Sequence, residues 1–112
     1  MDLSQIRAFL TVCETKSFTK AAHKINMSQP SISLKIKALE KYLGAKLLIR
    51  EQSNIRLTDE GSYAEEKFSE IINRIAAIEE NFSQLKKNKN GGKWWFLNHI
   101  WEVKTYDNPK DI

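Results

Sequence analysis

Residues 17–44, SFTKAAHKINMSQPSISLKIKALEKYLG, hold two helical patterns of different length joined by a polar turn. Ser17 is a good N-cap for the first pattern, whose small and apolar residues fall on one side of a short helix. Asn26 suits the left-handed conformation that ends such a helix. In the second pattern, apolar residues recur at spacings of 4, 3 and 4 before a glycine: Ile32, Ile36, Leu39, Leu43 and Gly44. The stretch therefore predicts a short helix, a turn, and a longer helix that packs through one apolar stripe.

The longer helix begins with an unusual density of polar side chains. Ser28 can cap it, and Pro30 is tolerated in the first turn, where its missing N–H would have no helical partner. The face opposite the apolar stripe contains no acid and consists of Pro30, Ser31, Ser33, Leu34, Lys37 and Lys41. This polar and basic face predicts contact with an anionic partner, because packing alone does not need it.

The segment before this stretch predicts another helix. Residues 2–16 begin with Asp2 and Gln5 at the spacing of a capping box. The apolar face of this helix contains Leu3, Ile6, Phe9, Leu10 and Cys13. We interpret Cys13 as a small core residue and not as a reactive thiol.

The segment after the longer helix predicts a β-hairpin. Two short β-like runs, Leu47–Arg50 and Ile55–Leu57, flank the polar tip EQSN. Arg50 and Arg56 lie on these runs, so both arms of the expected hairpin carry an arginine.

From Thr58 the pattern is helical for about thirty residues. Thr58 can cap this helix, and the acids at 59 and 60 suit the positive end of its dipole. Seven apolar residues recur at alternating spacings of 4 and 3: Ala64, Phe68, Ile71, Ile75, Ile78, Phe82 and Leu85. Such a seam indicates a coiled coil, and the alternative is a helix that lies along its own domain. Because thirty residues span about 45 Å, more than a small domain covers, we expect a partner helix.

The composition limits the classes of protein that fit. The chain has 112 residues, 41% of them hydrophobic, which is enough for one compact domain of modest core. Residues 1–50 hold nine Lys/Arg and three Asp/Glu, a balance of +6, so the positive charge lies with the polar helix. Cys13 is the only cysteine, which excludes an intrachain disulfide. We expect a cytoplasmic protein, since the chain shows neither a signal peptide nor a membrane span.

The sequence offers little support for catalysis. It contains no glycine-rich phosphate loop, no HExxH and no Cys/His cluster, so we expect no enzyme, no metal and no cofactor. Two functional classes remain, a nucleic-acid-binding regulator and a helical protein-interaction module. The order of helix, short helix, turn, polar-faced helix and hairpin is that of a winged helix-turn-helix, whose second helix enters the major groove. There Gln29 can pair with adenine, while Lys37 and Lys41 suit phosphates.

Residues 9–50, FLTVCETKSFTKAAHKINMSQPSISLKIKALEKYLGAKLLIR, closely resemble the N-terminal domain of LysR-type transcriptional regulators. The resemblance rests on SFTKAA, SQPSIS, ALE and LTDEG at these spacings and extends to about residue 87. It implies a mainly α fold: a winged helix-turn-helix of three helices and a two-stranded wing at 1–58, then a long linker helix at 59–88. Regulators of this kind dimerise through the linker helix, often assemble further into tetramers, and bind interrupted palindromes, commonly A·T-rich, in double-stranded promoter DNA.

The resemblance also implies roles for single residues. The base-reading positions of the family match Gln29, Pro30, Ser31 and Ser33, Lys37 stands at a phosphate contact, and Arg50 matches the arginine that opens the wing. The complete predicted DNA-binding set is Ser17, Thr19, Ser28, Gln29, Pro30, Ser31, Ser33, Leu34, Lys37, Lys41, Arg50, Asn54 and Arg56. The predicted dimerisation set is the seam Ala64, Phe68, Ile71, Ile75, Ile78, Phe82 and Leu85.

Two positions depart from the family pattern. Leu34 stands where the family often has arginine, and a leucine in the groove suits a thymine methyl rather than guanine. The alternative is a surface leucine that contacts nothing. Ser53 and Asn54 stand where the wing tip usually has a second basic residue, which Arg56 can replace.

Residues 89–112 form a tail of a different character. They contain three tryptophans, have no clear period, and do not resemble the effector-binding domain that follows the linker helix in the family. We expect a truncated chain, and the alternative is a stand-alone DNA-binding dimer. In either case we expect it to bind DNA without a small-molecule effector and not to contact membranes. The expected protein partner is a second copy, a higher oligomer, or a full-length relative in a mixed dimer. The alternative function is a helical protein-interaction module or a dominant-negative partner without its own target.

Overall fold

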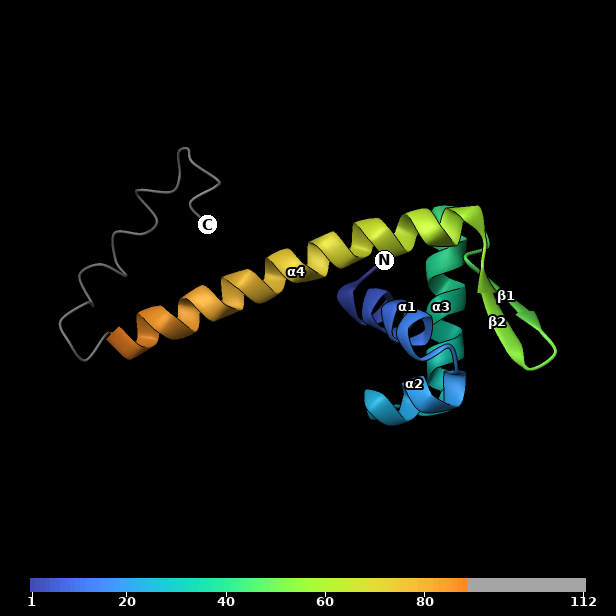
Figure 1. Ribbon diagram of the computed structural model, residues 1–112, viewed down its shortest axis with the longest axis horizontal. Helices are drawn as coiled ribbons and strands as arrows, with labels where there is room; N and C mark the ends of the chain where they lie inside the picture. Colours follow the sequence, from blue (N-terminus) through green and yellow to red (C-terminus); the bar gives the residue numbers. More distant parts are fainter. Residues whose placement is uncertain (89–112) are drawn as a thin grey trace. The chain divides into compact units, whose positions relative to one another are not determined.

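The structure is a computed structural model that describes residues 1–88 (Figure 1). Its elements are α1 (Leu3–Thr15), α2 (Phe18–Lys24), α3 (Gln29–Leu43), β1 (Leu48–Glu51), β2 (Asn54–Leu57) and α4 (Asp59–Asn88). Three helices, a two-stranded antiparallel wing and a long helix make up a winged helix-turn-helix, which confirms the fold expected from the sequence. The expected tail at 89–112 lies outside the described residues.

Polar side chains determine where the helices begin. At α1, Asp2 and Gln5 form the expected capping box: the Gln5 N–H donates to Asp2 Oδ1 at 2.8 Å, and the Asp2 N–H donates to Gln5 Oε1 at 3.3 Å. At the starts of α2, α3 and α4 the cap is a hydroxyl group. Its oxygen accepts a hydrogen bond from the backbone N–H three residues later; these caps are Ser17, Ser28 and Thr58. The caps therefore confirm all four helix starts that the sequence predicts.

Left-handed residues end the first three helical segments. The expected left-handed conformation of Asn26 is confirmed, with a φ of 58°. Gly44, which follows the last apolar residue of the longer helix, also has a positive φ, 76°. Lys16 also has a positive φ, 56°, at the C-cap of α1. The sequence did not predict it, because a lysine is not typical of this conformation.

The core lies among α1, α2, α3, the start of β1 and the first turns of α4. Its fully buried large side chains are Phe9, Val12, Ile32, Leu39 and Leu47. Phe68 of α4 joins this core, where its ring meets Phe9 edge-to-face at 6.2 Å between centroids. Leu3 and Leu43, expected on the inward faces of their helices, are each 42% exposed. Both lie in the terminal turn of a helix, where the apolar stripe runs past the edge of the core.

The hairpin is shifted from its expected limits. β1 runs Leu48–Glu51 and β2 runs Asn54–Leu57, so the outer residues of the expected EQSN tip belong to the strands. The turn is the two residues between them, and Gln52 adopts a φ of 55°, as the tightest hairpin turns require. The expectation of a four-residue tip was therefore wrong.

The chain divides into two compact units. The first is Met1–Glu70 and includes the first turns of α4, and the second begins at Ile71. None of the helices within residues 1–88 has both the length and the apolar character needed to cross a membrane.

Candidate nucleic-acid interface

The turn between α2 and α3 presents the first turn of α3 at the surface. Gln29 and Pro30 are exposed there, and Ser31 and Ser33 are half-buried. Ser28 Oγ accepts a hydrogen bond from the Ser31 N–H at 3.2 Å, so this hydroxyl caps the helix. The exposed beginning of α3 thus carries amide and hydroxyl groups that can donate to or accept from a ligand.

α2 supports this turn from one side. Ser17 Oγ accepts from the Lys20 N–H at 3.0 Å, so this residue of the predicted DNA-binding set caps α2. Thr19 Oγ1 donates to Gln29 Oε1 at 3.4 Å, and this hydrogen bond joins the two helices. It orients the Gln29 amide and leaves both N–H groups of Nε2 without a protein partner within residues 1–88.

The outward face of α3 continues the polar surface. Leu34 is 67% exposed, which is high for a leucine, and it lies among lysines. Lys37 and Lys41 are exposed and form no ion pair within residues 1–88. Two positive charges and one apolar side chain therefore remain available on this face.

The two arginines of the hairpin lie on opposite faces of it. In the strand register Arg50 pairs with Ile55 and Arg56 pairs with Ile49, which places the two side chains on different sides of the pleat. Arg50 packs on Phe18 of α2, with its guanidinium carbon 3.9 Å from the ring centroid. This cation–π contact joins the hairpin to the helix-turn-helix.

Arg56 is engaged in an ion pair on the other face. Its Nη2 lies 2.9 Å from Glu51 Oε2 across the hairpin. The hydrogen bond and the charge of Arg56 lower the pKa of Glu51, and Glu51 raises the pKa of Arg56. Both side chains are more than half exposed, at 58% and 51%, so water screens the pair and a phosphate can compete for the arginine.

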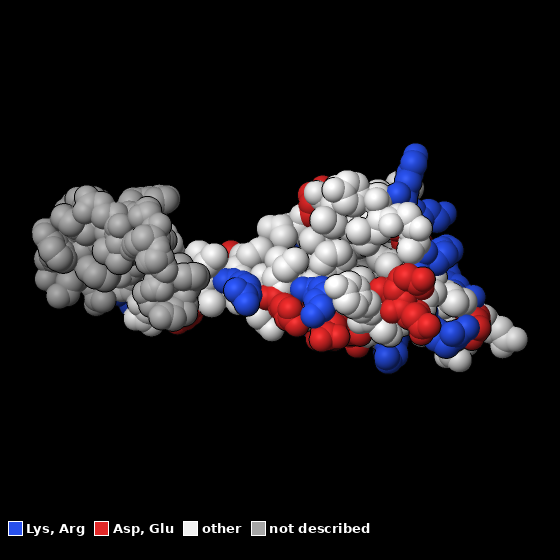
Figure 2. Space-filling view, turned by 90° about the horizontal axis from the view of Figure 1, so that it is seen from above, with Lys and Arg blue, Asp and Glu red and all other residues white. Residues whose placement is uncertain are grey.

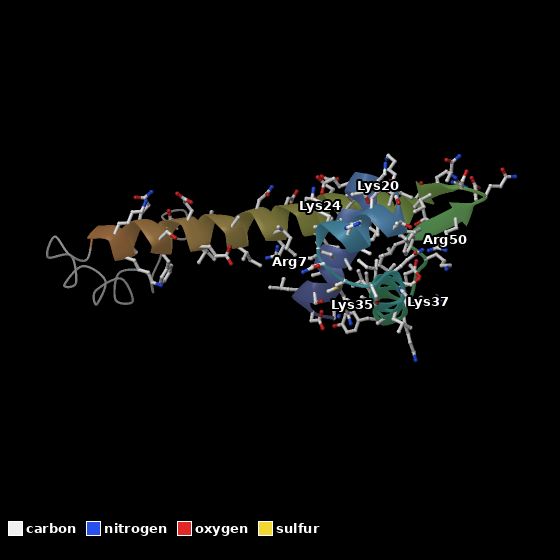
Figure 3. The ribbon with its side chains drawn as sticks, turned by 90° about the horizontal axis from the view of Figure 1, so that it is seen from below. Arg7, Lys20, Lys24, Lys35, Lys37 and Arg50 are labelled. Carbon is white, nitrogen blue, oxygen red and sulfur yellow. The ribbon has the colours of Figure 1, made fainter. Side chains whose placement is uncertain are left out.

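Basic side chains of α1, α2, α3 and β1 are present on the side of the molecule that Figure 3 shows. In the view of the molecule from below, Arg7, Lys20, Lys24, Lys35, Lys37 and Arg50 are labelled around α2 and α3 (Figure 3). We call these six residues the basic face. Viewed from above instead, acidic and basic side chains are intermixed along α4 (Figure 2).

Four members of the basic face were missed by reasoning from sequence motifs: Arg7, Lys20, Lys24 and Lys35. They come from α1, α2 and the less exposed side of α3, and only the fold brings them together. The balance of +6 over residues 1–50 was the signal that could have found them. Lys24 is also paired with Glu14 of α1 at 2.8 Å, which holds it beside α1.

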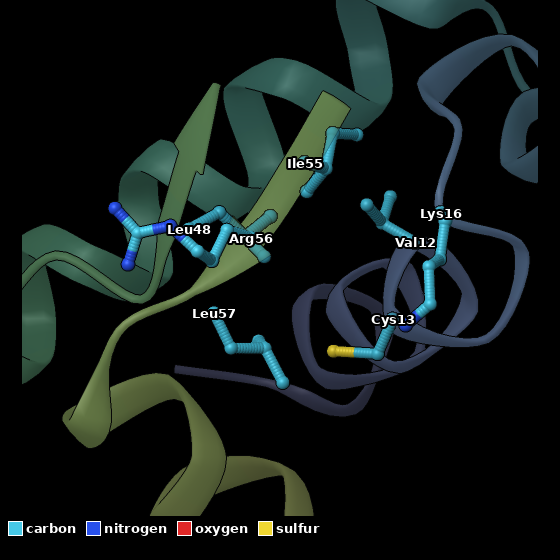
Figure 4. Close-up of a pocket in the computed structure, with 7 residues that line it drawn as sticks. All are labelled: Val12, Cys13, Lys16, Leu48, Ile55, Arg56 and Leu57. Carbon is cyan, nitrogen blue, oxygen red and sulfur yellow. The ribbon is translucent and has the colours of Figure 1, made fainter. Parts of the chain in front are cut away.

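A small cavity lies between α1 and the hairpin (Figure 4). It has a volume of about 190 Å³ and is lined by Val12, Cys13, Lys16, Leu48, Ile55, Arg56 and Leu57. Burial, with the negative charge of Glu65, raises the pKa of Cys13 from 9.0 to about 12. The thiol therefore stays protonated at neutral pH, as a core residue does. No group of His, Cys, Asp or Glu that could hold a metal occurs within residues 1–88.

The predicted dimerisation set divides into two parts. Ala64 and Phe68 are each only 7% exposed, because they pack in the first compact unit. A helix that packs on its own domain has the same short sequence period, so the burial of these two residues fits that alternative, and their place in an intermolecular seam stays a prediction. In the second unit Ile71, Ile78 and Phe82 are 43%, 43% and 48% exposed, and Ile75 and Leu85 are half-buried. We call these five residues the exposed α4 stripe.

Comparison with known proteins agrees with this geometry. The model of the family of bacterial regulatory helix-turn-helix proteins of the lysR type matches residues 3–62. The chain belongs to the lysR family. It is 40% identical to the HTH-type transcriptional regulator XapR of Escherichia coli over 83 residues, which cover 70% of this chain and 28% of that protein. It is 37% identical to the HTH-type transcriptional regulator YtlI of Bacillus subtilis over 91 residues, which cover 81% of this chain and 29% of that protein.

Solved structures of lysR-family proteins have the same fold. A crystal structure of a BenM_DBD complex with catB site 1 DNA matches with a TM-score of 0.73 and 31% identity, covering 77% of this chain and 96% of that chain. A second BenM_DBD complex, with benA site 1 DNA, matches with a TM-score of 0.70 and 32% identity, covering 75% and 98%. The chain spans less than a third of the two curated relatives named above, 28% and 29%. What it shares with them is a LysR-type DNA-binding transcriptional regulator domain.

Proposed function

We propose that this lysR-family chain binds promoter DNA as a dimer, with the beginning of α3 in the major groove and the hairpin at the adjacent minor groove. The observation that carries the proposal is the exposed, capped first turn of α3. The basic side chains of α1, α2, α3 and β1 add to it (Figure 3). The two BenM_DBD structures, which are complexes with DNA, support it.

The first turn of α3 supplies the base-reading groups. The oriented amide of Gln29 pairs with adenine, and the hydroxyls of Ser31 and Ser33 bond to base edges of either kind. Leu34 has no hydrogen-bonding group and a side chain that is 67% exposed, so it meets a thymine methyl. Bound sites should therefore favour thymine at the Leu34 position, and a preference for guanine there would contradict this assignment.

The lysines and arginines supply phosphate contacts. Lys37 and Lys41 extend from α3, and Arg50 is held against α2 by Phe18. Each phosphate that is neutralised releases condensed counterions, so binding should weaken steeply with salt. These contacts position the domain and carry no sequence information of their own.

The exposed α4 stripe supports the dimer. Ile71, Ile78 and Phe82 are large apolar side chains more than two-fifths exposed, and they recur at coiled-coil spacing. The same stripe would accept α4 of a relative, so a mixed dimer is a second partner that it fits. Dimerisation would place two recognition helices on two half-sites of one operator.

Selection from a pool of random double-stranded DNA tests the proposal. The regulator function predicts an enriched motif with two related half-sites, whereas a protein-interaction module predicts none. Binding to the selected site should then be measured over a range of salt concentrations, with the apparent affinity as readout.

Lys37→Ala should weaken binding to all sequences and lower the salt slope by about one for each bound subunit, because one phosphate contact is lost per subunit. Lys67→Ala is a matched control, since Lys67 lies on α4 near Glu66 and Glu70 at 3.9 and 3.8 Å. An equal change of slope in both variants would contradict the assignment of Lys37.

A further inference from the structure

The connector between α3 and the hairpin is organised by one residue, Glu40, through its backbone carbonyl and its side chain. The backbone N–H groups of Gly44 and Ala45 donate to the Glu40 carbonyl oxygen at 2.8 and 3.1 Å. Those of Leu47 and Leu48 donate to Glu40 Oε2 at 2.8 and 3.3 Å. Lys46 Nζ lies 3.7 Å from Glu40 Oε1. Every residue from 44 to 48 thus contacts Glu40.

The backbone hydrogen bonds dominate this arrangement. Glu40 is only 9% exposed, and a buried carboxylate is tolerated only where hydrogen bonds or charges compensate its lost hydration. Lys46 is 71% exposed, so water weakens its contribution. The Leu47 and Leu48 N–H groups belong to residues 1% and 5% exposed, and without Glu40 they would lose a charge-assisted acceptor.

The far end of the hairpin returns to the same connector. The Thr58 N–H donates to the Leu47 carbonyl at 3.1 Å, and Thr58 Oγ1 donates to the Lys46 carbonyl at 2.6 Å. Both arms of the hairpin are therefore tied to residues 46–48, and Glu40 ties these residues to α3. This carboxylate is therefore one of the ties between the hairpin and the helices, beside the packing of Arg50 on Phe18.

We propose that Glu40 is a positioning residue for DNA binding, which holds the hairpin arginines and the first turn of α3 in the geometry that engages two adjacent grooves together. This inference rests on the proposed function. Glu40 itself is buried at the far end of α3 from Gln29, so the proposed role acts through the hairpin and not through a contact of its own with DNA. Glu40 affects binding because a binding group that is displaced by even a small distance loses much of its contribution to affinity.

Glu40→Gln tests the first step without DNA. The amide has the size of the carboxylate but lacks its charge, and hydrogen bonds to an ionised acceptor are about twice as strong as neutral ones. Hydrogen exchange of the Leu47 and Leu48 amides should therefore become faster by about tenfold. Glu66→Gln, which neutralises an exposed carboxylate of α4 and adds the same net charge, should leave this exchange unchanged.

Hydroxyl-radical footprinting on the selected DNA tests the second step. Arg50→Ala defines the protection that depends on the hairpin, and Gln29→Ala defines the positions that depend on α3. Glu40→Gln should lose the hairpin-dependent protection and keep the α3-dependent protection, whereas a purely stabilising role would weaken both in proportion.

Each result has a definite consequence. A wild-type footprint that Glu40→Gln leaves intact or weakens uniformly would overturn the positioning role alone, as would unchanged exchange at Leu47 and Leu48. A wild-type chain that protects no DNA would overturn the proposed function, and the inference with it.

Discussion

At the scale of single residues, the hydrogen bond between Thr19 and Gln29 holds the proposed base-reading group before DNA binds. A free glutamine side chain loses rotamer freedom when it binds, which costs about 0.5–1.5 kcal/mol. Thr19 Oγ1 already donates to Gln29 Oε1 at 3.4 Å, so the side chain of Gln29 loses part of this rotamer freedom on folding and not on binding. The carbonyl oxygen keeps a second lone pair, and the amide can still pair with adenine through both of its groups.

Thr19→Val should therefore reduce discrimination at the base pair read by Gln29 by about 0.5–1.5 kcal/mol, because valine keeps the shape of threonine but cannot donate. Thr19→Ser keeps the hydroxyl and should retain most of the discrimination. Competition binding with four duplexes that differ only at this base pair measures the effect. Equal discrimination by the Thr19→Val variant and the wild type would remove Thr19 from the specificity determinants.

The exposed residues of the site are the ones that the sequence could predict. Leu34 and Lys37 follow from helical periodicity, because a position opposite the apolar stripe must face solvent. Gln29 follows instead from its place in the first turn of the expected recognition helix. Glu40 could not be found this way. It is an acid near the end of a basic helix, and only the path of residues 44–48 back over α3 turns it into a buried acceptor.

At the scale of elements, two glycines end or join segments for different physical reasons. Gly44 has a φ of +76° at the C-cap of α3, and an added Cβ would meet nothing within 4 Å. Gly61 lies in the first turn of α4, where an added Cβ would overlap the Leu47 carbonyl oxygen. The first position needs backbone freedom, and the second needs space for the connector.

Gly61→Ala should destabilise the fold by roughly 3 kcal/mol or more, because backbone and not a flexible side chain occupies the space. Gly44→Ala should cost only about 1–2 kcal/mol, the strain of a left-handed residue. Urea unfolding followed by circular dichroism gives both free energies. A smaller loss for Gly61→Ala than for Gly44→Ala would contradict this account of the junction.

The sequence also predicted the hairpin as an element but not the arrangement of its side chains. The β-like runs and turn residues placed it correctly within one residue at the outer ends. The positive φ of Gln52 closes a two-residue turn, and the resulting register sends Arg50 to α2 and Arg56 to Glu51. A shift of one residue would exchange these faces, so the two roles depend on the turn and not on composition.

At the scale of the whole chain, α4 combines a core segment and a surface segment in one helix. The apolar spacing of 4 and 3 continues without a break from Ala64 to Leu85, so periodicity alone could not separate the two. Burial separates the two segments, because Phe68 is 7% exposed in the first unit and Phe82 is 48% exposed in the second. The surface segment is the part that remains for a partner.

The dimer proposal makes a prediction that depends on this division. Ile75→Asp should dissociate the dimer, because it places one unpaired carboxylate from each subunit in the apolar seam at a cost of several kcal/mol. Ala76→Asp, in the same turn but exposed and away from the stripe, is the matched control for charge and helix propensity.

Sedimentation measures the mass of each variant, and fluorescence anisotropy measures binding to DNA with one or two half-sites. We expect Ile75→Asp to sediment as a monomer and to bind two half-sites no more tightly than one, while Ala76→Asp behaves like wild type. A monomeric wild type, or equal dissociation in both variants, would show that the exposed α4 stripe serves another purpose.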